Sequence, residues 1–164
     1  MDVIRAPWRM DYINSSATDN MTDSCIFCSC AASEDDEENL IIARGSTCFV
    51  ILNRYPYSNG HLMVIPYRHT SLLESLNSDE KLELVSLAQF SLDALKKIMN
   101  PDGFNLGINL GNTAGAGSET HLHLHGVPRW SGDTNFMSVT AETKVLPEAL
   151  SVTRAKLIEV LDTK

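Results

Sequence analysis

The sequence predicts an α+β fold: an antiparallel sheet of about five strands, a long helix after the third strand and a C-terminal helix. Short apolar or β-branched runs follow one another with turn residues between them, as in strands that pair antiparallel. One long segment, 78–99, has apolar residues at helical spacing. The chain has 164 residues, 43% of them hydrophobic, which is enough for one compact core.

Five segments have the composition of β-strands. They are 40–43, 47–52, 61–66, 104–110 and 121–127. A turn at Arg44-Gly45 is expected to join the first two strands, and the turn cluster 55–60 precedes the third. These short connections favour neighbouring strands that run in opposite directions.

Two helices are predicted. Asn77 is expected to cap the long helix, with Glu80 returning a bond to the cap. The turn residues 100–103 end it. Pro147 is expected to open a C-terminal helix that runs to Leu161. The stripe of the long helix that we assign to the core is Leu84, Leu87, Ala88, Leu92, Leu95 and Met99.

Residues 1–24 are predicted to form a polar N-terminal arm, and residues 25–164 a single domain. The net charge of -8 argues against a broad surface for nucleic-acid polymers, so an anionic ligand would need a local cluster of donors. No stretch has the length and apolarity of a membrane span, and the N-terminus lacks the apolar run of a secretory signal. We therefore expect a cytoplasmic protein without a membrane partner, whose four cysteines are reduced or metal-bound.

Three of the five histidines alternate along the last predicted strand, as His121, His123 and His125. They would share one face, with Leu122 and Leu124 filling the core on the other. On a straight strand the first and third lie roughly 13 Å apart, so one metal ion cannot bind all three. The cluster must serve at least two purposes, among which are hydrogen bonds to phosphate, proton transfer and attack on phosphorus.

The neighbourhood of the histidines favours phosphate over the rival interpretation, a site for metal alone. Residues 111–120 form a loop rich in Gly, Ser and Thr, whose backbone N–H groups can approach an anion closely. Elsewhere, Cys25 and Cys28 have the two-residue gap of half a zinc site, against the alternative of two ordinary thiols. Cys30 is a competing ligand, whereas Cys48 alternates with strand residues and is assigned to the core.

The histidine pattern resembles the histidine-triad (HIT) family, whose motif is His-φ-His-φ-His-φ-φ, where φ is apolar. Residues 121–127 match it, except that Gly126 departs from the apolar pattern. The similarity runs from Cys25 to about Met137 and includes 53–66, where Asn precedes a Pro/Gly turn and a His. It implies a HIT-like fold. The flanks, 6–13 and 127–137, are similar to bacterial diadenosine polyphosphate phosphorylases and hydrolases.

The resemblance implies a nucleotidyl transferase or hydrolase that cleaves a dinucleoside polyphosphate such as diadenosine tetraphosphate. His123 aligns with the family nucleophile, which forms a covalent nucleotidyl-histidine. His125 and His61 align with histidines that bind phosphate, and Asn53 with a residue that holds the ribose hydroxyls. Further candidates are Asn109 near the phosphates, Ser118 at the phosphate or leaving group, and Trp130, whose indole could stack on a base or pack at an interface.

Gly117 stands where hydrolytic relatives often carry Gln, which slightly favours inorganic phosphate over water as the second acceptor. In relatives with the cysteine pair, the positions of His69 and His121 complete a Cys₂His₂ site, so the resemblance implies a structural zinc. It also implies a homodimer, and any Mg²⁺ would arrive with the substrate. Two alternatives remain open: a nucleotide-binding or sensing module with weak hydrolase activity on phosphoramidates or polyphosphates, and a zinc hydrolase with an open coordination position.

Overall fold

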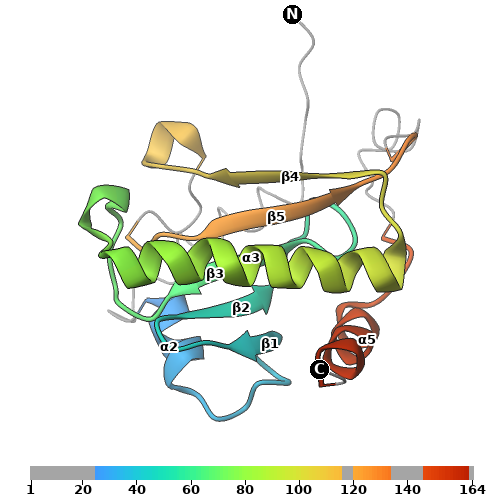
Figure 1. Cartoon of the computed structure of the whole chain (residues 1–164), viewed down its shortest axis with the longest axis horizontal. Coiled ribbons are helices and arrows are strands. Elements are labelled where there is room, and N and C mark those ends of the chain that lie inside the picture. The colour runs from blue at the N-terminus through green and yellow to red at the C-terminus, as the bar shows by residue number, and fades with distance from the viewer. Residues whose placement is uncertain (1–24, 116–119, 134–145, 163–164) are drawn as a thin grey trace, which may run out of the picture.

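The computed structural model describes residues 25–115, 120–133 and 146–162. The predicted N-terminal arm, residues 1–24, lies outside the described residues. Within them, five strands form an antiparallel sheet in the order β1-β2-β3-β5-β4 (Figure 1), which confirms the α+β prediction. The strands are β1 (Ile41–Arg44), β2 (Cys48–Leu52), β3 (Leu62–Pro66), β4 (Gly103–Ile108) and β5 (Leu124–Arg129).

The register gives the sheet two different faces, because directly opposed residues point to the same side. Val64 pairs with Val50 on one neighbour and with Leu124 on the other, and this row packs in the larger core with the helices. Met63, one residue earlier, pairs with Ile51 and His125 and therefore faces the opposite side. A smaller apolar cluster covers only part of that second face.

The larger core lies under α3 (Ser78–Met99) and α5 (Leu150–Asp162), and Figure 1 shows α3 running across the sheet. The predicted bounds of α3 are confirmed. Asn77 accepts from the N–H of Glu80, whose carboxylate accepts from the N–H of Asn77, so the capping box is present. The helix ends at Met99, and the C-cap residue Asn100 has a left-handed φ of 45°. No described helix has the length and apolarity needed to span a bilayer.

A short helix, α2 (Ile26–Ala32), was not expected from the sequence. A seven-residue helix has little stability of its own, so propensity alone does not reveal it. It forms because Phe27 and Cys30 are buried against the second face of the sheet, among Phe49, Ile51, Met63 and Ile65. Two 3₁₀ turns, η1 (Leu73–Ser75) and η2 (Asn112–Ala114), complete the described elements.

The expected fifth strand, 121–127, is wrong at its beginning: β5 starts at Leu124 and extends to Arg129. Residues His121 and Leu122 do not pair in the sheet because they form hydrogen bonds with the chain at and after the end of β3. The N–H of Leu122 donates to the carbonyl of Thr70, and the His121 ring bonds to the carbonyl of Pro66. His121 and His123 therefore belong to an irregular segment beside the chain that follows β3.

Other boundaries differ by a few residues from the predicted ones. Arg44 belongs to β1, so the turn that joins β1 and β2 lies at 45–47 instead of at Arg44-Gly45. β4 ends at Ile108, two residues before the predicted end. α5 begins at Leu150, three residues after Pro147. All these differences lie at the ends of strands or helices, where the hydrogen bonds that define a boundary depend on the neighbouring segments.

The two outer strands of the sheet have different surroundings. On β1, the guanidinium of Arg154 from α5 donates to the carbonyl of Ile41, so this helix covers part of the edge. On β4, Leu106 is 54% exposed, and Asn105 and Gly107 are exposed as well. The edge of β4 thus presents an apolar side chain at a place where another strand could pair.

The turn between β1 and β2 is anchored to α3 by the carboxylate of Glu83. This carboxylate accepts from the N–H groups of Ser46, Thr47 and Cys48 and from the Thr47 hydroxyl. Burial is the largest single influence on Glu83 and raises its pKa, but the four hydrogen bonds together outweigh it and lower the pKa to about 2.

Candidate active site and metal site

The histidines predicted to bind phosphate meet on the second face of the sheet. His125 is in β5, between Met63 of β3 and Gly107 of β4. His61 immediately precedes β3, and its ring is fully buried. Gly107 carries no side chain, and a Cβ built there would have no described atom within 4 Å, so the strand beside His125 is open. An anionic group could approach the histidines from this side.

A directed chain of hydrogen bonds connects His61 to His125. The backbone N–H of Tyr57 donates to Nδ1 of His61 across 2.9 Å, so this nitrogen is an acceptor. The proton of His61 is then on Nε2, which lies 3.0 Å from Nδ1 of His125 and donates to it. His125 is thereby left with its own proton on Nε2. This arrangement makes Nε2 of His125 a hydrogen-bond donor, as a phosphate-binding histidine requires.

His123 is oriented differently. Its Nδ1–H donates to the main-chain carbonyl of His121 across 2.8 Å, so Nε2 carries the lone pair. The ring is 5% exposed, and burial lowers its pKa, which favours the neutral form. The rings of His123 and His125 are 4.8 Å apart and nearly perpendicular. A neutral imidazole whose Nε2 carries the lone pair thus lies beside a histidine whose Nε2 is a donor.

Of the two amide-bearing candidates, Asn53 lies beside His61. Nδ2 of Asn53 is 3.4 Å from Nδ1 of His61. The side-chain oxygen of Asn53 accepts from the backbone N–H of Tyr55, which orients the amide. Asn109 follows β4, and its amide donates to the carbonyl of Gly115 across the loop. Gly117 and Ser118, the other loop candidates, lie outside the described residues.

Trp130 directly follows β5. Five residues of extended chain separate it from His125, which corresponds to roughly 16 Å. Its backbone N–H donates to the carboxylate of Asp133, which also pairs with Arg129. The turn that contains Trp130 is therefore anchored, but at the far end of β5 from the histidines. Its predicted stacking on a base remains a prediction.

Four residues form a second cluster that could hold a metal ion. Cys25, Cys28, His69 and His121 each offer one ligand atom, and these atoms all lie within 4.8 Å of one another. The Cys25 Sγ and the His121 Nδ1 are 3.3 Å apart, as are the Cys28 Sγ and the His69 Nδ1. Helix α2 brings the two sulfurs together, since Cys25 is its N-cap residue and Cys28 lies in its first turn.

The donor set fits a closed tetrahedral site, because two thiolates and two imidazole nitrogens fill four positions. Nε2 of His121 lies 2.8 Å from the Pro66 carbonyl and donates to it, which leaves Nδ1 as the lone-pair nitrogen that faces the sulfurs. Burial lowers the pKa of His121. Cys30 does not belong to the cluster and is buried in the smaller core, and Cys48 is fully buried in the larger one, as predicted.

The three histidines of the motif are thus divided between two sites. His121 faces the cysteines, while His125 lies beside His61 and His123 lies beside His125. Sequence reasoning missed two participants. Phe27 contacts the rings of His121 and His123, and Tyr57 supplies the N–H that fixes the tautomer of His61. The position of Phe27 between the two cysteines could have indicated its role from the sequence. The role of Tyr57 could not be predicted in this way, because every residue except proline has a backbone N–H.

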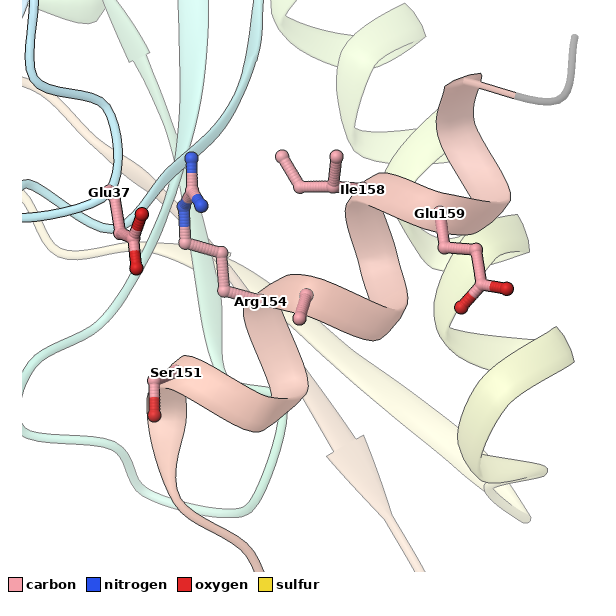
Figure 2. A pocket seen from close by; sticks show the side chains of 6 residues that line it. Glu37, Ser151, Arg154, Ile158 and Glu159 are labelled. Atoms are coloured by element: carbon pink, nitrogen blue, oxygen red, sulfur yellow. The ribbon is translucent and has the colours of Figure 1, made fainter.

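A separate hollow of about 390 Å³ lies against α5, on the side of the acidic turn that precedes β1 (Figure 2). Its lining residues are Glu37, Ser151, Arg154, Ala155, Ile158 and Glu159. Three of these side chains are charged, two of them negatively, and none belongs to either histidine cluster. We therefore assign this hollow no part in the two sites above.

A HIT domain profile matches residues 34–132 of the chain. A protein of Mycobacterium tuberculosis (strain CDC 1551 / Oshkosh) named AP-4-A phosphorylase is 48% identical over 122 residues, which cover 74% of this chain and 63% of that protein. The chain therefore matches less than two thirds of the length of this relative.

Solved structures with the same fold include two histidine triad proteins. The structure of a Zn-bound histidine triad family protein from Mycobacterium smegmatis has a TM-score of 0.69 at 26% identity, and the match covers 85% of this chain and 94% of that one. A hypothetical histidine triad nucleotide-binding protein from Sulfolobus tokodaii strain7 also has a TM-score of 0.69, at 27% identity, with 85% and 93% covered.

Proposed function

The chain belongs to the HIT domain family, and on that premise we propose that it is an enzyme that cleaves a dinucleoside polyphosphate through His123. The observation that carries the proposal is the orientation of this ring. Its Nδ1–H is engaged by the His121 carbonyl, so Nε2 is the nucleophilic atom. A donor, Nε2–H of His125, is supplied by the adjacent ring.

With diadenosine tetraphosphate, Nε2 of His123 attacks the α-phosphorus of one adenosine. A P–N bond forms, the bond between that phosphorus and the bridging oxygen breaks, and ATP leaves with the oxygen. The acceptor then attacks the same phosphorus and breaks the P–N bond, which restores His123. Nε2–H of His125 stabilises charge on the non-bridging oxygens, and we assign the same task to Ser118 and to N–H groups of the 111–120 loop.

We assign the nucleoside contacts to Asn53, Asn109 and Trp130. Asn53 is beside His61 and would hold ribose hydroxyls, and Asn109 at the end of β4 would contact the phosphates. Trp130 would stack on a base. Because it lies roughly 16 Å along β5 from His125, it would contact the distal part of a long substrate.

Inorganic phosphate is the acceptor we favour. Gly117 occupies the position at which hydrolytic relatives often carry Gln, so a side chain that orients water is missing there. The 48% identical relative bears the name AP-4-A phosphorylase, which agrees with this choice. Phosphate attack on the adenylyl-histidine gives ADP, whereas water attack gives AMP.

We propose zinc for the four-ligand cluster, held by Cys25, Cys28, His69 and His121. Two sulfur and two nitrogen donors suit Zn²⁺ and leave no open position for a substrate. Zinc would stabilise the junction between α2 and the segment before β5. This closed donor set argues against a zinc hydrolase with an open coordination position.

We also propose that the chain forms a homodimer through β4. This strand is at an edge of the sheet and exposes Leu106 and, just after it, Leu110. Pairing of two copies there would bury these side chains and continue the sheet from one copy into the other. The opposite edge, at β1, is partly covered by Arg154.

The product distribution tests the function directly. The protein is incubated with diadenosine tetraphosphate, with and without inorganic phosphate, and the nucleotides are separated by ion-exchange chromatography. We expect ADP plus ATP, formed only when phosphate is present. AMP plus ATP would overturn the choice of acceptor. Two molecules of ADP without phosphate would mean that the central phosphoanhydride is cut and would exclude attack on the α-phosphorus. Tight mononucleotide binding without any turnover would favour a sensing module instead.

A further inference from the structure

Phe27 lies within the cysteine segment, between Cys25 and Cys28, and is 7% exposed. Its ring centroid is 5.6 Å from that of His121, in an edge arrangement at 84°. It is 5.1 Å from the ring centroid of His123, with the planes tilted by 51°. One side chain therefore contacts both a candidate metal ligand and the ring to which we assign the attack on phosphorus.

A second contact is required to fix the orientation of the His123 ring. Its hydrogen bond to the His121 carbonyl fixes the direction of Nδ1, but one bond leaves the ring free to tilt about that direction. Among the residues that the structure describes, two rings pack against it, those of His125 and Phe27. A change of ring direction moves Nε2 relative to the phosphorus, and small misplacements of a reacting atom slow a reaction strongly.

We propose that Phe27 is a positioning residue that holds the His123 ring from the side of the metal site. The cysteines fix the start of α2, α2 fixes Phe27, and Phe27 limits the tilt of His123. The metal site thus reaches the reacting ring by two routes, the His121 carbonyl and the Phe27 ring. This inference rests on the proposed function, because it takes His123 as the nucleophile.

The test compares Phe27→Leu with a matched control, Phe49→Leu. Phe49 is buried in the same apolar cluster and stacks on Tyr67 at 5.3 Å, on the β2 side of the cluster. Both variants lose an aromatic ring from that cluster, so both should lose some thermal stability. We expect Phe27→Leu to keep its bound metal and to lose about tenfold in kcat with KM changed by less than about twofold. Phe49→Leu should keep the wild-type kcat.

A spectroscopic measurement makes the result independent of turnover. Nitrogen-15 NMR of the histidine rings reports the protonated nitrogen, and we expect a single Nδ1–H form of His123 in the wild type and in Phe49→Leu. In Phe27→Leu the His123 signals should broaden or show both tautomers. An unchanged kcat with unchanged signals would overturn the inference, as would an equal kcat loss in Phe49→Leu. A raised KM at unchanged kcat would show that Phe27 contacts substrate instead. If the wild type cleaves no dinucleoside polyphosphate, the proposed function fails, while the NMR comparison still decides the positioning role.

Discussion

Nδ1–H of His123 donates to the main-chain carbonyl of His121 across 2.8 Å, while the side chain of His121 points its own Nδ1 at the sulfurs of Cys25 and Cys28. His121 therefore takes part in both sites, with its backbone carbonyl in one and its ring in the other. Because these are separate atoms, the two sites can be perturbed separately.

Replacement of the His123 ring should remove catalysis without removing the metal. His123→Ala and His123→Asn both lack the nucleophilic nitrogen, so turnover of diadenosine tetraphosphate should fall by at least about 10³-fold. The metal ligands are unchanged, so the metal-to-protein ratio should match that of the wild type. Steady-state kinetics and elemental analysis on the same samples measure both. Turnover retained in His123→Asn would exclude the covalent mechanism.

The hydrogen-bond chain makes His61 necessary for the tautomer of His125. His61→Asn removes the Nε2–H donor to His125, so the proton of His125 is no longer confined to Nε2. We expect kcat to fall by about 10²-fold, the magnitude typical of one lost transition-state donor. Nitrogen-15 NMR should show a mixture of His125 tautomers in the variant and a single Nε2–H form in the wild type. A single unchanged tautomer would contradict the chain. The melting temperature serves as the control for folding, since His61 is fully buried.

The two cysteine positions in α2 should differ in their effect on metal content. Cys28→Ala removes one of the four donors, and we expect loss of the bound metal and a melting temperature lower by roughly 10 °C. Cys30→Ala is the matched control, because Cys30 is in the same helix but outside the donor cluster. Its metal content should be that of the wild type. If Cys30→Ala lost the metal and Cys28→Ala retained it, Cys30 and not Cys28 would be the ligand.

Glu83 should make stability depend on pH in the acid range. Its pKa is lowered to about 2 in the folded state from 4.5, so its contribution is complete above about pH 4.5 and is lost as the pH falls toward 2. Glu83→Gln should lower the free energy of unfolding at pH 7 by about 2 kcal/mol and flatten the pH dependence between 4.5 and 2. Urea titrations across this range measure both effects. The exposed Glu74→Gln should change neither, and equal slopes for wild type and Glu83→Gln would refute the assignment.

The edge of β4 should control the oligomeric state. Leu106→Glu places a charge on the exposed face of this strand, and we expect light scattering to show a monomer where the wild type is a dimer. Leu82→Glu is the control, because Leu82 is 69% exposed and belongs to α3 instead of β4. A wild-type monomer would reject the dimer, and dissociation caused equally by Leu82→Glu would place the interface elsewhere.

The sequence by itself determined the elements whose causes are local. The bounds of α3 follow from its apolar spacing and from Asn77 and Glu80, which lie three residues apart and cap it. Strands β1, β2 and β3 and the burial of Cys48 follow equally from short apolar runs. The candidate histidines were visible for the same reason, since strict alternation is itself a pattern.

Tertiary structure alone decided how those histidines are used. Alternation predicted that all three histidines lie on one face of a strand. In the structure, the segment before Leu124 does not pair in the sheet but hydrogen-bonds to the chain after β3. There His121 contacts cysteines that lie 96 and 93 residues away in the sequence. Helix α2 is too short for propensity to reveal, and it forms through burial on a sheet that the sequence shows only as separate strands. The contact of Phe27 with His123 depends on both events. Contacts between distant segments are set by the free energy of the whole packed chain, so no local pattern encodes them.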